Sequence, residues 1–421
     1  MSTALLVFGI VSIVLTAVVL FRGRSIGPFI VPYFFLGWIG GELALHIVVI
    51  QAIAAVALVA AGGLAESAGG AGLVLLVVSW VGLSAAQFRA SRAVGVLRRA
   101  VGEGFATADE VPGQLGAVRT FVPWVELVNP FRMRRAGVEM VKDIAYGDAG
   151  KRNLLDVYRP VERGAALPVL LQIHGGGWTI GDKREQAKPL MNLLAANGWA
   201  CVAANYRLSP KASFPDHIVD VKRAIAWIRE HGPDYGLDPS FIAITGGSAG
   251  GHLSSLAALT ANDPEFQPGF EDADTSLAAC VPFYGIYDFL DRAGAHRGQS
   301  MEGFLEKYVM KVSVAEQREV WEKASPLSHV RPDAPPFFVI HGSHDSLAPV
   351  ENARTFVTAL REVAREPVLY AELPGAQHAF EVFHSVRTGH TINAVHRFLE
   401  NVHATFRIRR EDGGEKIAAS S

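Results

Sequence analysis

The strongest constraint on the fold of this 421-residue chain is a serine, Ser248, that stands between two kinds of secondary structure. The short apolar run 241–245 is typical of a buried parallel strand, and the pattern of residues 252–259 is typical of a helix. The serine lies in a G-x-S-x-G sequence, which in this context forms a sharp turn from strand to helix. Gly246 and Gly250 remove side chains that would clash across that turn. We therefore expect a parallel sheet with a serine exposed at the carboxyl end of one strand.

A second glycine-rich stretch, HGGGW at 174–178, follows another apolar run at 168–173. Three successive glycines let a loop turn its backbone N–H groups toward a ligand with no side chain in the way. An HGGG-type loop is the partner of the G-x-S-x-G turn in acyl transfer, where the two together hold a negatively charged oxygen. The N–H group of Ala249, at the start of the helix after the serine, is expected to face the same oxygen.

A serine hydroxyl is a poor nucleophile without a base and a residue that orients the base. In chains with this pair of motifs the order is Ser, Asp, His, each after a strand. Residues 336–342 form a predicted strand, and Asp345 is the only carboxylate in the loop 343–350 that follows. Residues 368–373 form the next predicted strand, and His378 lies in the loop after it. We expect His378 to act as the base and Asp345 to orient it.

Other histidines compete for the role of the base. His341 stands at a strand end, where packing or hydrogen bonding is the expected role. His344 precedes Asp345 on the wrong loop, and His384 and His390 are expected at the surface near the start of the last helix.

The sequence predicts no metal and no cofactor, because the histidines show no H-E-x-x-H or similar spacing. The formal net charge of −2 gives no reason to expect a nucleic-acid partner. Cys201 and Cys280 both fall in apolar runs, which indicates no disulfide framework and fits a reducing compartment.

From about residue 141 to 406 the sequence resembles the α/β-hydrolase superfamily, and within it the hormone-sensitive-lipase-like carboxylesterases. It is also similar to their acetyl-esterase, feruloyl-esterase-like and kynurenine-formamidase-like relatives. The matching pieces are YGD at 146–148, LDVYRP at 155–160, HGGGW at 174–178, GDK at 181–183, YRLSP at 206–210, FP at 214–215, YGLDP at 235–239, GGSAGGH at 246–252, HGSHDSLAPV at 341–350 and LPGAQHAF at 373–380.

The resemblance implies an α/β fold with a mostly parallel, doubly wound sheet and helices on both faces. It implies Ser248 as nucleophile, His378 as base and Asp345 as its orienting residue. The oxyanion donors that it implies are the N–H groups of Gly176, Gly177 and Ala249. The residues that support the two motifs are His174, Gly175, Trp178, Gly246 and Gly250.

The sequence departs from the lipase-like pattern at Gly247, where many members carry an acidic residue before the serine. This glycine, together with Trp178 after HGGG, favours the feruloyl-esterase and formamidase-like branch. The sequence therefore leaves open whether esters or amides are cleaved. A membrane protein that binds ligands without catalysis is a third hypothesis, and the intact set of motif residues argues against it.

The N-terminal quarter is much more apolar than an ordinary soluble enzyme, and it raises the mean hydropathy of the whole chain to +0.23. Apolar runs occupy 5–20, 29–61 and 73–86. A bilayer core needs about 20 helical residues. We expect three membrane spans, the second long and tilted or kinked near Gly40-Gly41. A cleaved signal peptide is a poor alternative, because no Lys or Arg precedes Ala4 and no suitable cleavage site follows.

Positive charges near the spans predict their orientation, because arginines favour the cytoplasmic side. Arg22 and Arg24 place the first loop inside, the loop around Glu66 carries no positive charge, and the arginines at 89–99 return the chain inside. Three spans place the N-terminus outside and the hydrolase in the cytoplasm. Splitting the second run into two spans would reverse this orientation.

The predicted organisation is a transmembrane region of about three helices (1–90), a linker and cap or interfacial segment (91–140), a catalytic domain (141–408) and a flexible tail (409–421). Aromatic residues beside arginines between 121 and 135 suit a membrane interface or a cap over the active site. The expected partners are membrane lipids and a small-molecule or lipid ester. Glu42 and His46 share one helix face, which indicates either a polar contact between helices or a functional site.

Overall fold

The computed structural model describes residues 1–21, 29–105, 121–162, 166–295 and 301–420. Arg22 and Arg24, on which part of the predicted orientation depends, lie outside the described residues. The α-helices are α1 (Ser2–Leu20), α2 (Ile30–Glu42), α3 (Ala44–Ala60), α4 (Ser67–Ser91), α5 (Ala93–Gly104), α6 (Trp124–Val128), α7 (Lys188–Ala195), α8 (Asp216–His231), α9 (Ala249–Leu259), α10 (Glu302–Phe304), α11 (Arg318–Lys323), α12 (Val350–Val363) and α13 (Val386–Ser420). The strands are β1 (Val138–Ala145), β2 (Leu154–Pro160), β3 (Leu167–Ile173), β4 (Ala200–Ala204), β5 (Leu237–Gly247), β6 (Ala279–Phe283), β7 (Phe337–Gly342) and β8 (Val368–Leu373).

The strands form one eight-stranded sheet in the order β1-β2-β4-β3-β5-β6-β7-β8. The pairs from β4 through β3 and β5 to β8 are parallel, and β1 and β2 add antiparallel pairs at one edge. This confirms the mostly parallel sheet that the sequence predicts. The carboxyl ends of β3, β5, β7 and β8 lie together, so the loops that follow these strands meet at one end of the sheet.

Both faces of the sheet are buried under helices. Val169 and Leu171 of β3 pack with α8, α9 and α12 in one apolar cluster, and Leu170 of the same strand packs with α5, α7 and α13 in another. This alternation is what the two-residue period of a strand produces when both faces are covered.

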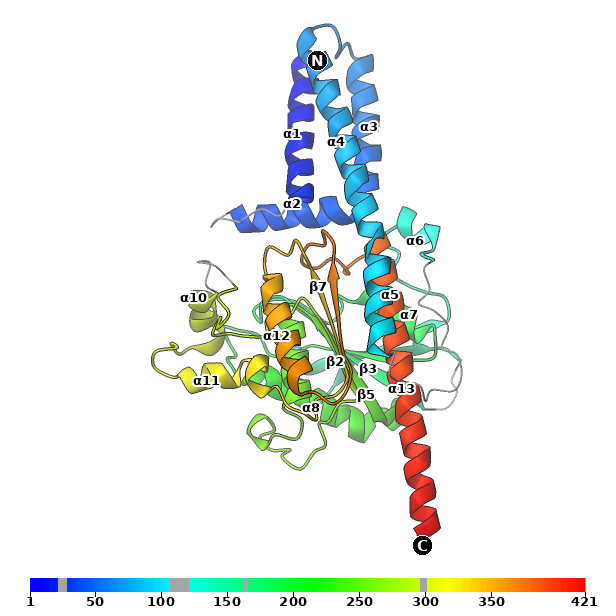
Figure 1. Ribbon diagram of the computed structural model, residues 1–421, viewed down its shortest axis with the longest axis vertical. Helices are drawn as coiled ribbons and strands as arrows, with labels where there is room; N and C mark the ends of the chain where they lie inside the picture. Colours follow the sequence, from blue (N-terminus) through cyan, green and yellow to red (C-terminus); the bar gives the residue numbers. More distant parts are fainter. Residues whose placement is uncertain (22–28, 106–120, 163–165, 296–300, 421) are drawn as a thin grey trace.

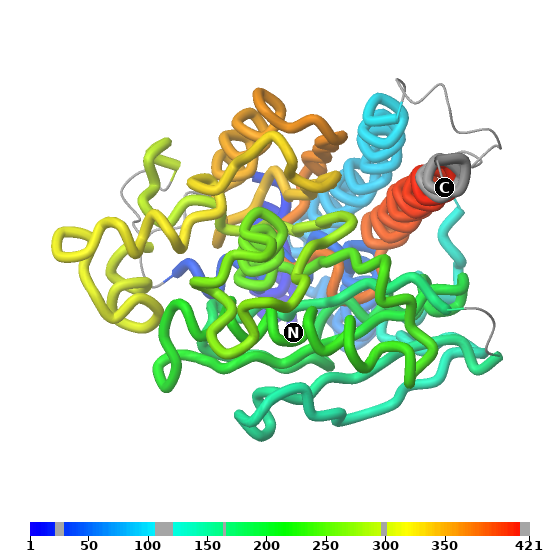
Figure 2. Tube along the Cα trace, turned by 90° about the horizontal axis from the view of Figure 1, so that it is seen from below, coloured from blue at the N-terminus to red at the C-terminus, as the bar shows by residue number. Residues whose placement is uncertain are grey.

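The first part of the segment 91–140, which was expected to be a linker and cap, is a helix that packs on the sheet. Residues 93–104 form α5, whose side chains Ala93, Leu97 and Val101 are buried against the sheet. Figure 2 shows α5 (cyan) beside α13 (red), and α5 also packs on β8. The spacing of these apolar residues is that of an amphipathic helix, so its arginines mark the outer face of a core helix. At the other end of the chain, α13 continues as helix to Ser420, where a flexible tail was expected.

The N-terminal helices stand as a bundle on the catalytic part of the molecule. In Figure 1, α1, α3 and α4 run alongside one another, and α2 crosses them at the end nearest the sheet. The helix Ser2–Leu20 and the helix Ser67–Gly104, which contains α4 and α5, are long and apolar enough to cross a membrane. The helices α2 and α3 reach the required length only when they are taken together, as one span broken in the middle.

The second predicted span is broken close to the expected position, but by much more than a kink. The chain bends by 91° between α2 and α3, at Leu43, two residues after Gly40-Gly41. Gly40 serves a different purpose, since a Cβ there would lie 2.5 Å from Cγ2 of Val19 in α1. The glycine allows α2 to pass close beneath α1, and the bend follows after Glu42.

The contact between α1 and α4 gives a test of this packing. A Cβ on Gly72 would lie 2.4 Å from the carbonyl oxygen of Leu5, whereas a Cβ on Gly70 would meet nothing within 4 Å. We expect Gly72→Leu to destabilise the detergent-solubilised protein by about 1–3 kcal/mol, because overpacking separates the helices. Gly70→Leu is the matched control, and thermal unfolding is the measurement. Equal midpoints for the two variants would contradict the packing described here.

Candidate active site

Ser248 occupies a strained turn directly after β5. Its φ of 58° and ψ of −122° lie in a region that residues with a side chain rarely adopt. Its N–H group donates to the carbonyl oxygen of Phe283 at 3.0 Å, and its own carbonyl oxygen accepts from the N–H of His252 at 2.9 Å. The first bond attaches the turn to β6 and the second begins α9, so the serine is fixed at the carboxyl end of the sheet.

Close backbone contacts on either side of the serine leave no room for a Cβ atom at Gly246 or Gly250. A Cβ on Gly250 would lie 2.1 Å from the carbonyl oxygen of Ile173, at the end of β3. A Cβ on Gly246 would lie 2.5 Å from the carbonyl oxygen of Gly250. Only glycine lets the start of α9 approach β3 this closely.

His378 and Asp345 meet at the same end of the sheet. His378 Nδ1 lies 2.7 Å from Oδ2 of Asp345, and Oδ1 of Asp345 accepts N–H bonds from Leu347 and Ala348. Burial by itself would raise the pKa of Asp345, but His378 and His341 outweigh it and hold the pKa below its ordinary range. His341 Nε2 lies 3.3 Å from the same carboxylate and 2.8 Å from the carbonyl oxygen of Ala348. The carboxylate therefore stays ionised and orients the imidazole.

The HGGGW loop lies beside the serine. A Cβ on Gly175 would lie 3.2 Å from the Cβ of Ser248, and the N–H of Gly175 donates to Gln186 Oε1 at 2.7 Å. Gly176 and Gly177 have φ values of 114° and 58°, which turn the peptide groups of this loop. Within the part of the chain that the structure describes, the N–H groups of Gly176, Gly177 and Ala249 donate to no protein acceptor. These three donors are available for a ligand oxygen.

Two buried side chains hold the HGGGW loop in place. His174 Nδ1 lies 2.7 Å from the carbonyl oxygen of Gly175, and its ring stacks on Tyr206 with centroids 4.4 Å apart. Burial lowers the pKa of His174 to about 4, so this histidine is neutral and structural. Trp178 Nε1 donates to Nδ1 of His252 at 3.2 Å, which connects the loop to α9.

Two residues near His378 were not predicted from the sequence, Tyr284 and Glu381. The Tyr284 ring lies 4.4 Å from the His378 ring, and its hydroxyl donates a short hydrogen bond to Glu381. A Cβ on Gly247 would lie 2.7 Å from the Tyr284 hydroxyl oxygen. The departure from the lipase-like pattern at Gly247 therefore has a steric cause, and that departure is the signal that could have led to Tyr284.

The environment of Glu381 is unusual for a carboxyl group. Burial raises its pKa to about 7, although the Tyr284 hydrogen bond and His378 both lower it. A buried acid that is half protonated near neutral pH lies next to the proposed base.

The histidines expected at the surface are buried. His384 is 2% exposed, and its Nδ1 lies 3.3 Å from Oε2 of Glu126. His390 is 7% exposed. The segment around α6 packs over this region, and Glu126 also pairs with Arg135 at 2.6 Å. The residues that bury His384 belong to a segment that is remote in sequence, so the sequence around His384 did not indicate its burial.

Among the described residues, Glu42 pairs with the catalytic part of the molecule and not with another helix of the N-terminal bundle. It forms a buried ion pair with Arg387 and accepts from Ser385 Oγ at 2.7 Å. The inner side of α2 thereby lies on the loop after β8, and the ring of Phe34 lies 6.1 Å from that of His378. The cap expected from residues 91–140 is formed in part by α2.

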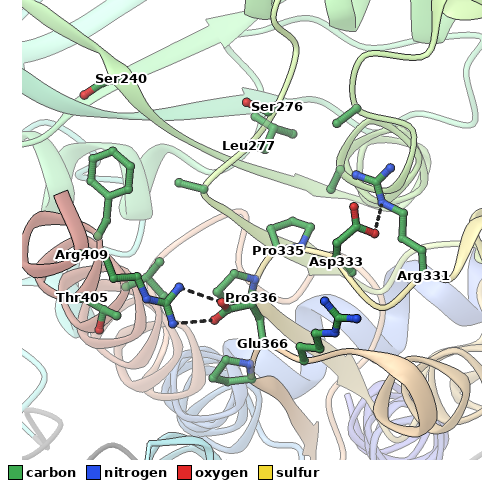
Figure 3. Close-up of a pocket in the computed structure, with 18 of the residues that line it drawn as sticks. Ser240, Ser276, Leu277, Arg331, Asp333, Pro335, Pro336, Glu366, Thr405 and Arg409 are labelled. Atoms are coloured by element: carbon green, nitrogen blue, oxygen red, sulfur yellow. Dashed lines mark hydrogen bonds and ion pairs between the residues drawn. The ribbon is translucent and has the colours of Figure 1, made fainter. Parts of the chain in front are cut away.

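A cavity of about 1020 Å³ lies away from this site (Figure 3). Its lining includes Ser240 in the first half of β5, Leu277 before β6 and Pro336 before β7. These positions are at the amino ends of the strands, opposite the serine. Among the described residues, no group of three or more His, Cys, Asp or Glu side chains could hold a metal ion.

Comparison with known proteins agrees with this geometry. A family model described as BD-FAE matches residues 155–360. The "Probable carboxylic ester hydrolase LipM" of Mycobacterium tuberculosis is 53% identical over 289 residues, which are 68% of this chain and 67% of LipM. The chain belongs to the α/β-hydrolase carboxylic ester hydrolases. "Esterase LipQ" of the same organism is 50% identical and is matched over 61% of each chain. These curated relatives are matched over no more than about two thirds of their length.

A solved structure extends the comparison to the fold. The crystal structure of esterase B from Lactobacillus rhamnosis is 20% identical, covers 76% of this chain and 98% of its own, and has a TM-score of 0.55. At this identity the likeness concerns the fold alone. It agrees with an α/β-hydrolase fold for this member of the esterase family.

The raised pKa of Glu381 predicts a pH-dependent stability. A carboxyl group with an ordinary value of 4.5 and a folded value of about 7 stabilises the fold in its protonated form, and that contribution is lost as pH rises through about 7. Gln at this position cannot ionise. We expect Glu381→Gln to gain stability relative to wild type between pH 5 and pH 8, on the order of 2 kcal/mol. Thermal midpoints at the two pH values measure this.

The exposed Glu185→Gln is the control for that experiment, and its stability difference from wild type should not change with pH. A difference for Glu381→Gln that is equally independent of pH would show that Glu381 ionises normally.

Proposed function

We propose that the protein is a membrane-anchored serine hydrolase that cleaves carboxylic esters through Ser248, His378 and Asp345. The observation that carries the proposal is the arrangement around Tyr284. Its ring lies against His378, and its hydroxyl group lies against Gly247, the neighbour of Ser248. The proposed nucleophile and the proposed base thus lie on either side of the Tyr284 side chain. Oδ2 of Asp345 lies 2.7 Å from Nδ1 of His378.

The mechanism follows from these positions. Ser248 Oγ attacks the ester carbonyl carbon while Nε2 of His378 accepts its proton. The carbonyl oxygen becomes negatively charged and is held by the N–H groups of Gly176, Gly177 and Ala249. His378 returns the proton to the leaving alcohol, which departs and leaves an acyl group on Ser248. Water, deprotonated by the same imidazole, then attacks the acyl group and releases the acid.

The N-terminal helices would anchor this enzyme in a bilayer. The helices Ser2–Leu20 and Ser67–Gly104 supply the required length and apolarity. In Figure 1 the N-terminus lies at the end of the bundle away from the catalytic part. Arg89 and Arg92 lie at the end of α4 that meets the catalytic part, and positive charge favours the cytoplasmic side. This supports a catalytic domain in the cytoplasm.

The relatives favour esters over amides as the substrate class. LipM is named a probable carboxylic ester hydrolase and LipQ an esterase. The amidase or formamidase alternative rests only on Gly247 and Trp178, and the position of Tyr284 accounts for Gly247 without reference to the substrate. Comparing turnover of short acyl esters with that of N-formylkynurenine separates the two classes.

Replacing the nucleophile is the first test of the proposed function. Ser248→Ala should lower hydrolysis of p-nitrophenyl butyrate by the detergent-solubilised protein by at least about 10³-fold, because the variant lacks the hydroxyl group that would form the acyl-enzyme. Ser276→Ala, at the opposite end of the sheet, is the matched control and should retain wild-type turnover. Retention of wild-type turnover by Ser248→Ala would show that the nucleophile lies elsewhere.

Asp345→Asn tests the orienting role separately. An amide at this position can donate to Nδ1 and favours the tautomer that cannot accept the serine proton. We expect kcat for p-nitrophenyl butyrate to fall on the order of 10⁴-fold with a smaller change in KM. A change confined to KM would contradict the role assigned to Asp345.

A further inference from the structure

We propose that α2 is an interfacial helix that lies in the bilayer surface over the active site, so that the enzyme takes a membrane-partitioned ester directly from the lipid phase. The substrate class rests on the proposed ester hydrolysis, whereas the position of α2 rests only on the proposed membrane anchoring by α1 and α4. In this proposal the exposed face of α2 contacts lipid, at the depth where the headgroups meet the acyl chains.

The orientation of α2 is the first argument. The bend of 91° at Leu43 turns α2 across α3, and Figure 1 shows α2 crossing the bundle at the end nearest the sheet. With α1 and α4 crossing the bilayer, a helix at right angles to them lies parallel to the membrane plane. Its place at the end of the spans puts it at the level of the interface.

The outer face of α2 is the second argument. Val31, Phe35, Leu36 and Ile39 are between 41% and 53% exposed. No charged residue occurs from 29 to 41, so this face offers water nothing but apolar side chains and backbone. An exposed apolar face of this kind is unfavourable in water and favourable at the acyl boundary of a bilayer.

The inner face of α2 connects the interface to the catalytic loops. A Cβ on Gly37 would lie 3.2 Å from Nε2 of Gln377, the residue before the proposed base. Gln377 Oε1 accepts from the N–H of His378 at 2.9 Å and from the N–H of Ser346 at 2.7 Å. One side chain beneath α2 thus joins the base loop to the loop of Asp345, and Phe34 covers the base itself.

The end of α2 is attached to the catalytic domain. Glu42 pairs with Arg387 in a buried contact, and Nη2 of Arg387 donates to the carbonyl oxygen of Pro374 at 3.1 Å. Removing one partner of a buried ion pair leaves an uncompensated charge, so this contact fixes where α2 lies. The interface and the base loop are therefore held in one position relative to each other.

The apolar surface continues around the site. Trp124, Val128 and Phe131 are 64–67% exposed, and the Phe131 ring lies 5.5 Å from Phe383, which also contacts Trp38 of α2 at 5.3 Å. Arg132 and Arg134 follow, as in segments that bind the headgroup region.

Beside the oxyanion loop, Ile180 is 69% exposed and Phe304 is 38% exposed. A Cβ on Gly177 would lie 3.5 Å from the Phe304 ring. An acyl chain that enters from the lipid side would meet apolar side chains from both directions before it reaches the serine.

The position of α2 is tested without reference to activity. Cys201 and Cys280 are buried, so a single cysteine in Leu36→Cys can carry an environment-sensitive fluorophore on the outer face of α2. Val363→Cys is the control, since this 42%-exposed residue ends α12 toward the amino ends of the strands. In nanodiscs with nitroxide-labelled acyl chains, we expect at least fivefold stronger quenching at position 36 than at position 363. Equal quenching at the two positions would overturn the proposal.

The delivery of substrate is tested by a ratio of two activities. In nanodiscs, Leu36→Asp should lower turnover of a long-chain p-nitrophenyl ester dissolved in the lipid at least tenfold relative to turnover of water-soluble p-nitrophenyl acetate. Val363→Asp should leave that ratio at its wild-type value. An unchanged ratio for Leu36→Asp would contradict delivery from the lipid. If the wild-type protein hydrolyses neither ester, the proposed function fails, and the quenching result still decides the position of α2.

Discussion

The close approach of the serine turn to the end of β3 is the constraint on which the active site depends. No Cβ fits at Gly250, because the carbonyl oxygen of Ile173 lies where it would stand. This contact starts α9 next to the HGGGW loop and places Ser248 in its strained conformation. A change in this packing would displace the proposed nucleophile and the proposed oxyanion donors together.

The loop after β8 is the second element on which function depends, because two parts of the molecule share it. It carries His378, and it is covered by α2 through Phe34 and by the segment after α6 through Phe131 and Phe383. The ion pair between Glu42 and Arg387 adds a buried polar contact to this apolar cover. The N-terminal helices are therefore not a separate unit, since they form part of the wall around His378, the proposed base.

The sequence predicts best what depends on short segments. The strand-turn-helix around Ser248 and the parallel sheet follow from patterns of a few residues, because glycine sterics and strand periodicity act locally. A kink near Gly40-Gly41 was predicted, but the right-angled turn between α2 and α3 was not, since Glu42 pairs with Arg387, a residue 345 positions along the chain. The burial of His384 has the same reason, because the segment that covers it is far away in sequence. The helix α5 is different, since its amphipathic spacing is a local pattern, and the expectation of a linker overlooked that pattern.

The central claim is that Ser248 is the nucleophile of an ester hydrolase. Its most direct test is to treat the full-length protein in detergent with a fluorophosphonate, which forms a covalent bond with an activated serine, and to locate the adduct by peptide mass spectrometry. The account predicts one adduct per chain, on the peptide that contains Ser248, and its loss when the protein is first incubated with an excess of ester substrate. No adduct, or an adduct on another residue, would contradict it.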